Sequence, residues 1–334
     1  MDALSEVLKA IRLDGAVYIN AQFTAPWCIE ARFGLDSAAS ARLPPSDHVA
    51  FFHVLIQGSC KSRLADGGET LNVQAGDILL FPHDHPHVLG SDVELPPAPE
   101  ATLTECPIED GMIQMRHGGG GAVTHFVCGY LACDRRICRP LFSALPRMMR
   151  VSVGSDDSTG WLLQLLRVGV QESTAQGPGA RSMLAKLSEL MFVEAMRRHA
   201  RALPAGQKGW LASLRDPHVG RALALLHGKP AYAWTVDALA REVALSRSAL
   251  ADRFVDLIGE PPMQYLTSWR LALAAQGLRT GNEPISRIAE RCGYESESAF
   301  NRAFKREFGV PPATWRKQVN AGEAVDDATA APAS

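Results

Sequence analysis

The chain has 334 residues, of which 46% are hydrophobic and 21% are charged, and a formal net charge of −2 at pH 7. This is the composition of an ordinary globular protein long enough for two domains, which excludes fibrous and low-complexity proteins. No apolar run approaches the roughly 18 residues of a membrane-spanning helix, and the start of the chain lacks the basic and apolar segments of a secretory signal. We therefore expect a cytoplasmic protein without a membrane partner, with most of its seven cysteines reduced.

The first 150 residues carry a strand pattern. Short apolar or alternating runs are separated by turns rich in Gly, Pro and Asp, which is typical of β-strands joined by tight loops. We expect residues 1–150 to form an all-β domain, a small barrel or jelly roll. The clearest strand candidates are residues 49–56, 60–64, 78–81 and 124–131.

Four histidines of this region are candidates for binding an effector or a divalent metal ion. His83, His85 and His87 alternate along the chain, so they would share one face if they continued a strand. His53 lies in an earlier apolar run, and histidine is the commonest metal ligand. The alternative interpretation is that the cluster belongs to a turn and that His53 is buried and hydrogen-bonded. The sequence leaves both interpretations open.

Three cysteines, Cys128, Cys133 and Cys138, are candidates for sensing oxidants. Their spacing differs from the paired Cys-x2-Cys motifs of structural zinc sites. Arg135 and Arg136 lie between the second and the third, and nearby guanidinium groups favour the reactive thiolate form of a cysteine. Cys128 lies within an apolar run, where a buried core position is the alternative.

A helical segment, residues 151–203, follows the predicted β domain. Apolar residues at helical spacing predict one helix from Trp161 to about Ser173 and another from Arg181 to about Ala202. These helices either cap the barrel or mediate dimerisation. Residues 204–209 then form a linker rich in Gly and polar residues.

The C-terminal third contains one unit twice. Val236, Leu239, Ala240 and Val243 have counterparts 49 residues later, and the helix that follows each set has counterparts 50 residues later. Each copy is a short apolar helix, a turn and a longer helix that ends in Gly-x-Pro-Pro, a sequence that suits a left-handed cap followed by a new helix. This in-register repetition favours two helix-turn-helix units over a plain helical bundle.

The second helix of a helix-turn-helix enters the major groove of DNA, and polar residues near its start contact bases and phosphates. We expect these contacts to come from both copies. The candidates are Ser246, Arg247, Ser248, Ala251, Asp252 and Arg253 in the first copy, and Ser296, Glu297, Ser298, Asn301, Arg302, Lys305 and Arg306 in the second.

One uninterrupted apolar helix from about Met263 to Thr280 should connect the copies. Its length of roughly 27 Å is close to the spacing of about 34 Å between successive major grooves. Residues 208–319 carry 16 Lys and Arg against 11 Asp and Glu, so the cationic surplus lies in this part of the chain, as contact with phosphates requires. One chain would then read two adjacent grooves of double-stranded DNA.

The segment from Ile285 to Pro312 follows, almost throughout, the signature of AraC/XylS-type transcriptional regulators, and residues 210–319 resemble the DNA-binding domain of that family. The runs 53–58 and 76–87 resemble the cupin domain found at the N-terminus of many such regulators. The resemblance implies a multidomain fold, with an N-terminal all-β cupin-like barrel, linking helices and a C-terminal all-α double helix-turn-helix domain. Residues 320–334 have little to bury and should form a disordered tail.

Metal-dependent cupins hold their ion with two histidines two residues apart, a following Glu and a later His. In this sequence His53 and His87 align with two of these positions, but Leu55 stands in place of the second histidine and Asp84 in place of a usual glycine. Metal-assisted catalysis needs about three ligands. We therefore expect no enzyme and no required cofactor, although a non-catalytic divalent metal at the histidines remains an alternative.

The sequence thus predicts a regulator that binds double-stranded DNA and senses a small-molecule effector through the barrel. Effector binding would alter the affinity for DNA or the contact with RNA polymerase. A cavity lined mainly by apolar groups would suit such an effector. A redox- or metal-responsive regulator is the alternative, and the family resemblance implies a homodimer.

Overall fold

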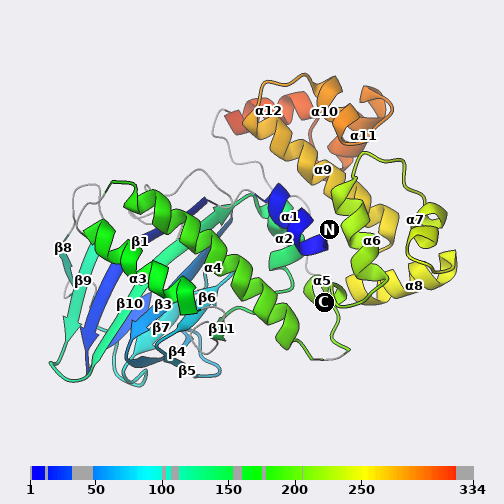
Figure 1. The fold of residues 1–334 in the computed structure, drawn as a ribbon. Coiled ribbons are helices and arrows are strands. Elements are labelled where there is room, and N and C mark those ends of the chain that lie inside the picture. Colours follow the sequence, from blue (N-terminus) through cyan, green and yellow to red (C-terminus); the bar gives the residue numbers. More distant parts are fainter. Residues whose placement is uncertain are drawn as a thin grey trace. The chain divides into compact units, whose positions relative to one another are not determined.

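The computed structural model describes residues 2–11, 14–31, 48–99, 103–106, 113–152, 160–174, 178–204 and 206–320. The chain divides into two compact units (Figure 1). The first, here called the β unit, comprises residues 13–135 and 145–203, and the second, the helical unit, comprises residues 1–12, 136–144 and 204–334. All but the first residue of the predicted disordered tail lies outside the described residues.

Two sheets form the β unit within the described residues. The larger has the strand order β11-β6-β3-β10-β1-β9-β8 and the smaller has the order β2-β7-β4-β5. The strands are β1 (Asp14–Thr24), β2 (Cys28–Ala31), β3 (His48–Gln57), β4 (Ser59–Leu64), β5 (Leu71–Gln74), β6 (Asp77–Phe81), β7 (His87–Gly90), β8 (Thr104–Cys106), β9 (Ile113–Gly118), β10 (Val123–Cys133) and β11 (Met149–Ser152). All four predicted strand runs are confirmed, as β3, β4, β6 and β10.

Side chains from both sheets meet in one apolar core. The larger sheet contributes Phe23, Phe81 and Phe126, and the smaller contributes Ile29 and Leu89. The ring of Phe23 lies edge-on to that of Phe126 at 5.3 Å between centroids, the arrangement that aromatic pairs favour. Large side chains of both sheets therefore pack together in this core.

Both predicted linking helices are confirmed and belong to the β unit. They are α3 (Gly160–Thr174) and α4 (Ala180–Ala202). Helix α3 packs on α4, and α4 packs on β1 and β10 (Figure 1). Because α4 covers the outer face of the sheet, β10 is buried on both of its faces. Its sequence is therefore a nearly continuous apolar run.

The helical unit contains the two repeats. The first is α7 (Val236–Glu242) with α8 (Arg247–Ile258), and the second is α10 (Ile285–Arg291) with α11 (Glu297–Phe308). Helix α9 (Pro262–Thr280) connects them as predicted. This unit also contains α5 (Trp210–Ser213), α6 (Val219–Gly228) and α12 (Pro312–Asn320). No helix in the described ranges has the length and apolar character needed to cross a membrane.

Two segments predicted within the N-terminal domain belong instead to the helical unit. Helix α1 (Ala3–Ala10) begins where the Asp2 carboxylate accepts a hydrogen bond from Ser5 N, and it contacts α6. Gln276 of α9 donates to the carbonyl of Ala10 at 3.1 Å. Most of α2 (Arg135–Phe142) is also in this unit. The contacts between α1 and the C-terminal helices join residues more than 200 positions apart. Local sequence patterns do not reveal contacts of this kind.

Candidate DNA interface and sensor residues

The two long helices of the repeats, α8 and α11, begin in the same way. The hydroxyl oxygen of Ser246 caps α8 by accepting a hydrogen bond from Ala249 N, and that of Ser296 caps α11 through Ala299 N, each at 3.2 Å. Such caps satisfy a backbone donor that the helix leaves free. Both helices end at a left-handed glycine, Gly259 or Gly309. The repeat in the sequence is therefore a repeat in the structure.

Helix α11 has one apolar face and one cationic face. Phe300, Phe304 and Phe308 are buried against α9 and α12. On the exposed side lie three cations, Arg302, Lys305 and Arg306. In the part of the chain that the structure describes, none of the three cations has an ion-pair partner. This face can therefore offer its full charge to phosphates.

Helix α8 presents much less free charge. Arg247 lies 3.5 Å from Asp237, with both side chains exposed. Arg253 Nε donates to Asp216 at 2.7 Å. The carboxylate of Asp216 also accepts from His218 N and Val219 N, before and at the start of α6. Burial raises the pKa of Asp216, but these hydrogen bonds outweigh it and lower the pKa overall. Arg253, a predicted DNA contact, thus holds α8 to the start of α6.

The other predicted contacts lie at the starts of the same two helices. Ser248 and Ser298 are exposed, each 3.3 Å from the serine that caps its helix. Ala251 and Asn301 are half-buried, and Asp252 and Glu297 are exposed. The structure therefore brings the predicted residues of each copy onto one helix, in the place where a helix-turn-helix reads DNA.

In the β unit, His53, His87 and Cys128 form a buried hydrogen-bonded chain. His53 Nε2 lies 2.7 Å from His87 Nε2, and His53 Nδ1 lies 2.8 Å from Cys128 Sγ. His87 Nδ1 lies 2.9 Å from the carbonyl oxygen of His85. A carbonyl only accepts, so Nδ1 of His87 donates, Nε2 of His53 donates to His87, and the Cys128 thiol donates to His53. One carbonyl thus fixes every proton of the chain.

Burial keeps the side chains of His53, His87 and Cys128 uncharged at neutral pH. It lowers the pKa of His87 to about 4, and it lowers the pKa of His53 well below the usual value, with a further contribution from His87. Burial also raises the pKa of the Cys128 thiol. The resulting neutral hydrogen-bonded chain is what a buried polar cluster requires.

Among the described residues, the cupin metal position offers two imidazoles that are already hydrogen-bonded to each other. The Nε2 atoms of His53 and His87 are hydrogen-bonded to each other, and each Nδ1 has another partner. Among the described residues, no group of three or more His, Cys, Asp or Glu is arranged to hold an ion. Two nitrogens fall short of the ligand number that a protein metal site needs.

Of the two interpretations of the histidines, the structure supports the turn with a buried, hydrogen-bonded His53, and His83 and His85 do not share a strand face with His87. Strand β6 ends at Phe81 and β7 begins at His87, so the two earlier histidines lie in the turn between them. Asp84 forms that turn with φ of 52°, a left-handed conformation that Asp tolerates better than most residues. It occupies the place of the glycine that the cupin motif usually has.

Comparison with known proteins establishes the family. A family model described as cupin matches residues 2–201, and one described as a helix-turn-helix domain matches residues 239–318. A putative AraC-like transcription regulator of Streptomyces lividans is 35% identical over 318 residues, 95% of this chain and 98% of that protein. The chain belongs to the AraC-type family of transcription regulators.

Other relatives agree with this assignment. The HTH-type transcriptional regulator AlkR of Acinetobacter baylyi is 30% identical and aligns over 95% of this chain and 100% of its own. Among solved structures, the DNA-binding domain of AdpA in complex with a target DNA is 30% identical, with a TM-score of 0.31, and covers 32% of this chain and 96% of that one. By its two family models and its full-length relatives, this AraC-type protein is a DNA-binding transcription regulator with an N-terminal cupin domain.

The cysteines of this regulator are in different states. Cys28, Cys60, Cys128 and Cys292 are free and buried. Cys133 ends β10 and Cys138 lies in α2, and both are disulfide-bonded. These two are exceptions to the expectation of reduced thiols. The sequence placed them together with Cys128 as one group, but Cys128 instead belongs to the buried histidine chain.

A groove of about 450 Å³ lies on the β unit at the ends of β4, β5 and β10. Two cations, Lys61 and Arg150, line it, and no Asp or Glu is among the described residues that do. Five uncharged polar side chains complete its polar lining. They are Ser59, Asn72, Gln74, Ser91 and Thr124.

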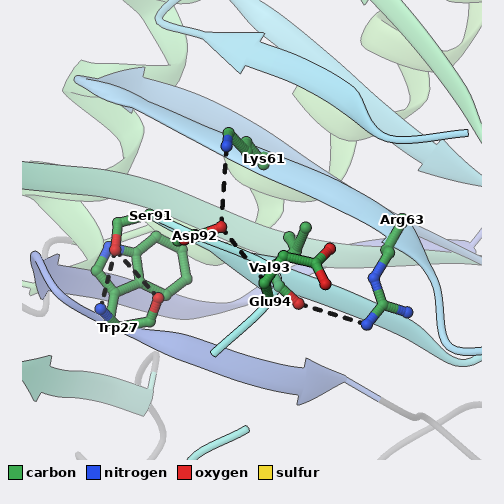
Figure 2. Close-up of polar contacts among 7 residues, drawn as sticks. All are labelled: Trp27, Lys61, Arg63, Ser91, Asp92, Val93 and Glu94. Carbon is green, nitrogen blue, oxygen red and sulfur yellow. Dashed lines mark hydrogen bonds and ion pairs between the residues drawn. The ribbon is translucent and has the colours of Figure 1, made fainter. Parts of the chain in front are cut away.

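Figure 2 shows how one wall of the groove is fixed. The hydroxyl of Ser91 accepts from Trp27 N at 2.9 Å and donates to Trp27 O at 3.2 Å. Lys61 Nζ lies 3.8 Å from the Asp92 carboxylate, a long and exposed pair that a ligand can displace at little cost. On the same strand, Arg63 turns to the carbonyl of Val93 at 3.3 Å and does not line the groove.

Proposed function

We propose that this regulator senses a small anionic effector at the groove of the β unit and that binding alters its affinity for DNA or its contact with RNA polymerase. The observation that supports the proposal is a groove whose volume suits a small molecule and whose charged lining residues, among those that the structure describes, are the cations Lys61 and Arg150. The core between the sheets contains aromatic and aliphatic side chains from both sheets. An effector shifts the regulator only if it binds one arrangement of the protein better than another.

Thermal unfolding of the full chain with inorganic phosphate, sulfate or succinate, at constant ionic strength, tests this proposal. We expect at least one of these anions to raise the Tm of the wild type, because a ligand stabilises the state that it binds. The shift should shrink in Lys61→Met and persist in Arg63→Met, which removes the same charge from the same strand outside the groove. Equal shifts in all three proteins, or none, would contradict an anionic effector at this groove.

A redox-responsive regulator is the second candidate, and the disulfide-bonded state of Cys133 and Cys138 supports it. Reduction of these two cysteines would remove a covalent bond that the structure contains. Cys128 is a weaker candidate, because burial raises its pKa and so disfavours the reactive thiolate. A change of DNA affinity with dithiothreitol, and none with the anions, would favour this candidate over the first.

The proposal includes no catalytic activity and no required metal. Its support is that the relatives are transcription regulators and that the cupin position offers two hydrogen-bonded imidazoles where a metal site needs more ligands. A DNA-binding regulator must be in the same compartment as its DNA. The proposal therefore includes the cytoplasmic location expected from the sequence. Stoichiometric metal in protein purified without chelators would contradict the metal-free account.

We further propose that the regulator is a homodimer that associates through α3. This helix buries Leu162 and Leu166 against the β unit, yet on its other side Leu165 and Val168 are 41% and 47% exposed. Leu190 of the neighbouring α4 is 48% exposed. Exposed large apolar residues on two packed helices are candidates for an interaction surface. A second copy would add further half-site contacts on DNA.

Light scattering of the full chain at micromolar concentration should therefore give a dimer mass. Leu165→Glu combined with Val168→Glu should give a monomer, because two charges cannot be buried unpaired in an apolar interface. Arg197→Glu, on an exposed side of α4, serves as a charge-changing control and should remain dimeric. A monomeric wild type would contradict the proposal, as would a dimeric double variant.

A further inference from the structure

The loop between α6 and α7 lies against the second helix-turn-helix, although it belongs to the first. Arg270 of α9 holds this loop, because its Nε donates to the carbonyl of Pro230 at 2.7 Å and its Nη2 donates to that of Tyr232 at 2.8 Å. One planar guanidinium thereby binds two backbone carbonyls at fixed separation, a geometry that the single ammonium of Lys cannot reproduce.

The other side of the loop contacts the turn between α10 and α11. Gly293 in this turn has φ of +78°, and a Cβ added to it would lie 2.8 Å from the carbonyl oxygen of Ala231 and 2.9 Å from its Cα. Both atoms are backbone and cannot rotate away. The loop of the first unit and the turn of the second are thus in close contact at Gly293.

The first repeat provides an internal control for this glycine. Ala244 occupies the matching position, also with positive φ, at 56°. In both turns the residue after this position donates to the carbonyl five residues back, Leu245 to Ala240 and Tyr294 to Ala289, each at 3.0 Å. This is the Schellman pattern. The turn itself therefore accepts an alanine, and the contact with the loop is what excludes one at Gly293.

The contact joins the two DNA-reading elements by a short path. The loop ends at Thr235, which caps α7 by accepting from Ala238 N at 3.1 Å, and Gly293 lies four residues before the start of α11. Without this contact, α9 would be the main connection between the repeats. A contact at both the loop and the turn restricts rotation about that helix, in the way that a second attachment point restricts a hinge.

We propose that Arg270 and Gly293 are positioning residues that fix α8 and α11 relative to each other, and thereby set the spacing between the two DNA half-sites that one chain accepts. The inference rests on both repeats binding one duplex. One added base pair turns the second half-site by about a tenth of a helical turn. A rigid reader must lose affinity on such a site, whereas a flexible reader can follow it.

The experiment begins with duplexes selected from a random pool by the full-length wild type. The spacer between the two halves of the selected site is then changed by one or two base pairs, and affinities are measured by fluorescence anisotropy. The wild type should lose about tenfold in affinity for each altered spacer. Arg270→Met should reduce this preference to about threefold or less, while its affinity for a duplex with a single half-site stays as in the wild type.

Two further variants separate geometry from charge and from folding. Arg270→Lys should behave like Arg270→Met, because the role is to hold two carbonyls, and a Lys that restores the preference would overturn the proposal. Ala244→Gly changes the matching turn without touching the loop and should keep the wild-type preference. Gly293→Ala should lose the preference, and its melting curve shows whether it is folded.

The outcomes distinguish this inference from the account on which it rests. A wild type without spacer preference would contradict reading of two grooves by one chain and the positioning role with it. A wild-type preference that persists in folded Arg270→Met would contradict the positioning role alone and leave two-groove reading intact.

Discussion

Replacing Arg302, Lys305 and Arg306 together by alanine should weaken DNA binding by about 100-fold or more at physiological salt. The three cations share the exposed face of α11 opposite its buried phenylalanines. Each phosphate that they neutralise releases counterions, so the slope of log affinity against log salt should fall by about three. Single substitutions should each cost roughly 1 to 3 kcal/mol where the side chain reads a base.

Titrations of a labelled duplex at several salt concentrations measure both quantities. Arg253→Ala in α8 is the matched control, because its guanidinium is bound to Asp216. We expect this control to lower the Tm while changing the salt slope by less than about one. A triple variant with wild-type affinity and slope would show that α11 does not enter the groove.

Acidification from pH 7 to pH 4 should destabilise both units by several kcal/mol. His87 in the β unit and His227 in the helical unit have a pKa of about 4 and about 3, against an ordinary value of 6.5, because both are buried. A histidine with a lowered folded pKa binds its proton in the unfolded chain first. Its stabilising effect is therefore complete above pH 6.5 and is lost as the pH falls toward the folded value, on the order of 3 to 5 kcal/mol for each group.

Urea unfolding at pH 7.5, 6, 5 and 4.5 checks this expectation. Trp269 lies 4.4 Å from the His227 ring, so with Trp27 and Trp161 of the β unit replaced by Phe, tryptophan fluorescence reports on the helical unit. His227→Gln should flatten the pH dependence of that transition, because glutamine does not titrate, while the transition of the β unit remains pH-dependent. A free energy of unfolding that stays constant down to pH 4.5 would contradict the neutral, buried histidines of the structure.

The sequence predicts the two repeats and the helix between them closely, because the signals there are local. Periodic apolar residues, capping serines and terminal glycines all act within one or two turns of a helix. They set the bounds of α8, α9 and α11 to within about two residues. The same logic placed the candidate contacts on two equivalent helices, since Ser246 and Ser296 mark where each begins.

Contacts between distant residues were beyond that reasoning. Arg253 has the charge and place of a DNA contact, but its partner Asp216 lies 37 positions earlier. The hydrogen bonds from Arg270 to the loop before α7 join residues that are about equally far apart in the sequence. A signal for it did exist, because the alignment of the repeats places Gly293 opposite Ala244, and a glycine required in only one of two equivalent turns indicates a neighbour close to its backbone.

The β unit shows the same division. Its clearest strands follow from apolar runs, but β1 and β9 were not identified, because their pairing depends on partners far along the chain. The alternation of the histidines could not decide between a strand and a turn for a related reason. A period of two predicts a shared face only within a strand, and the turn around Asp84 interrupts it. His53 and Cys128 meet because β3 and β10 pair in a register that places one opposite the other.

Hydroxyl-radical footprinting of the full-length protein on a selected duplex tests the central claim most directly. The account predicts two protected patches for each chain, about 10 to 10.5 base pairs apart on one face of the duplex, with the patch under α11 lost in the triple variant of Arg302, Lys305 and Arg306. A single patch for each chain, or protection that the triple variant leaves unchanged, would contradict it.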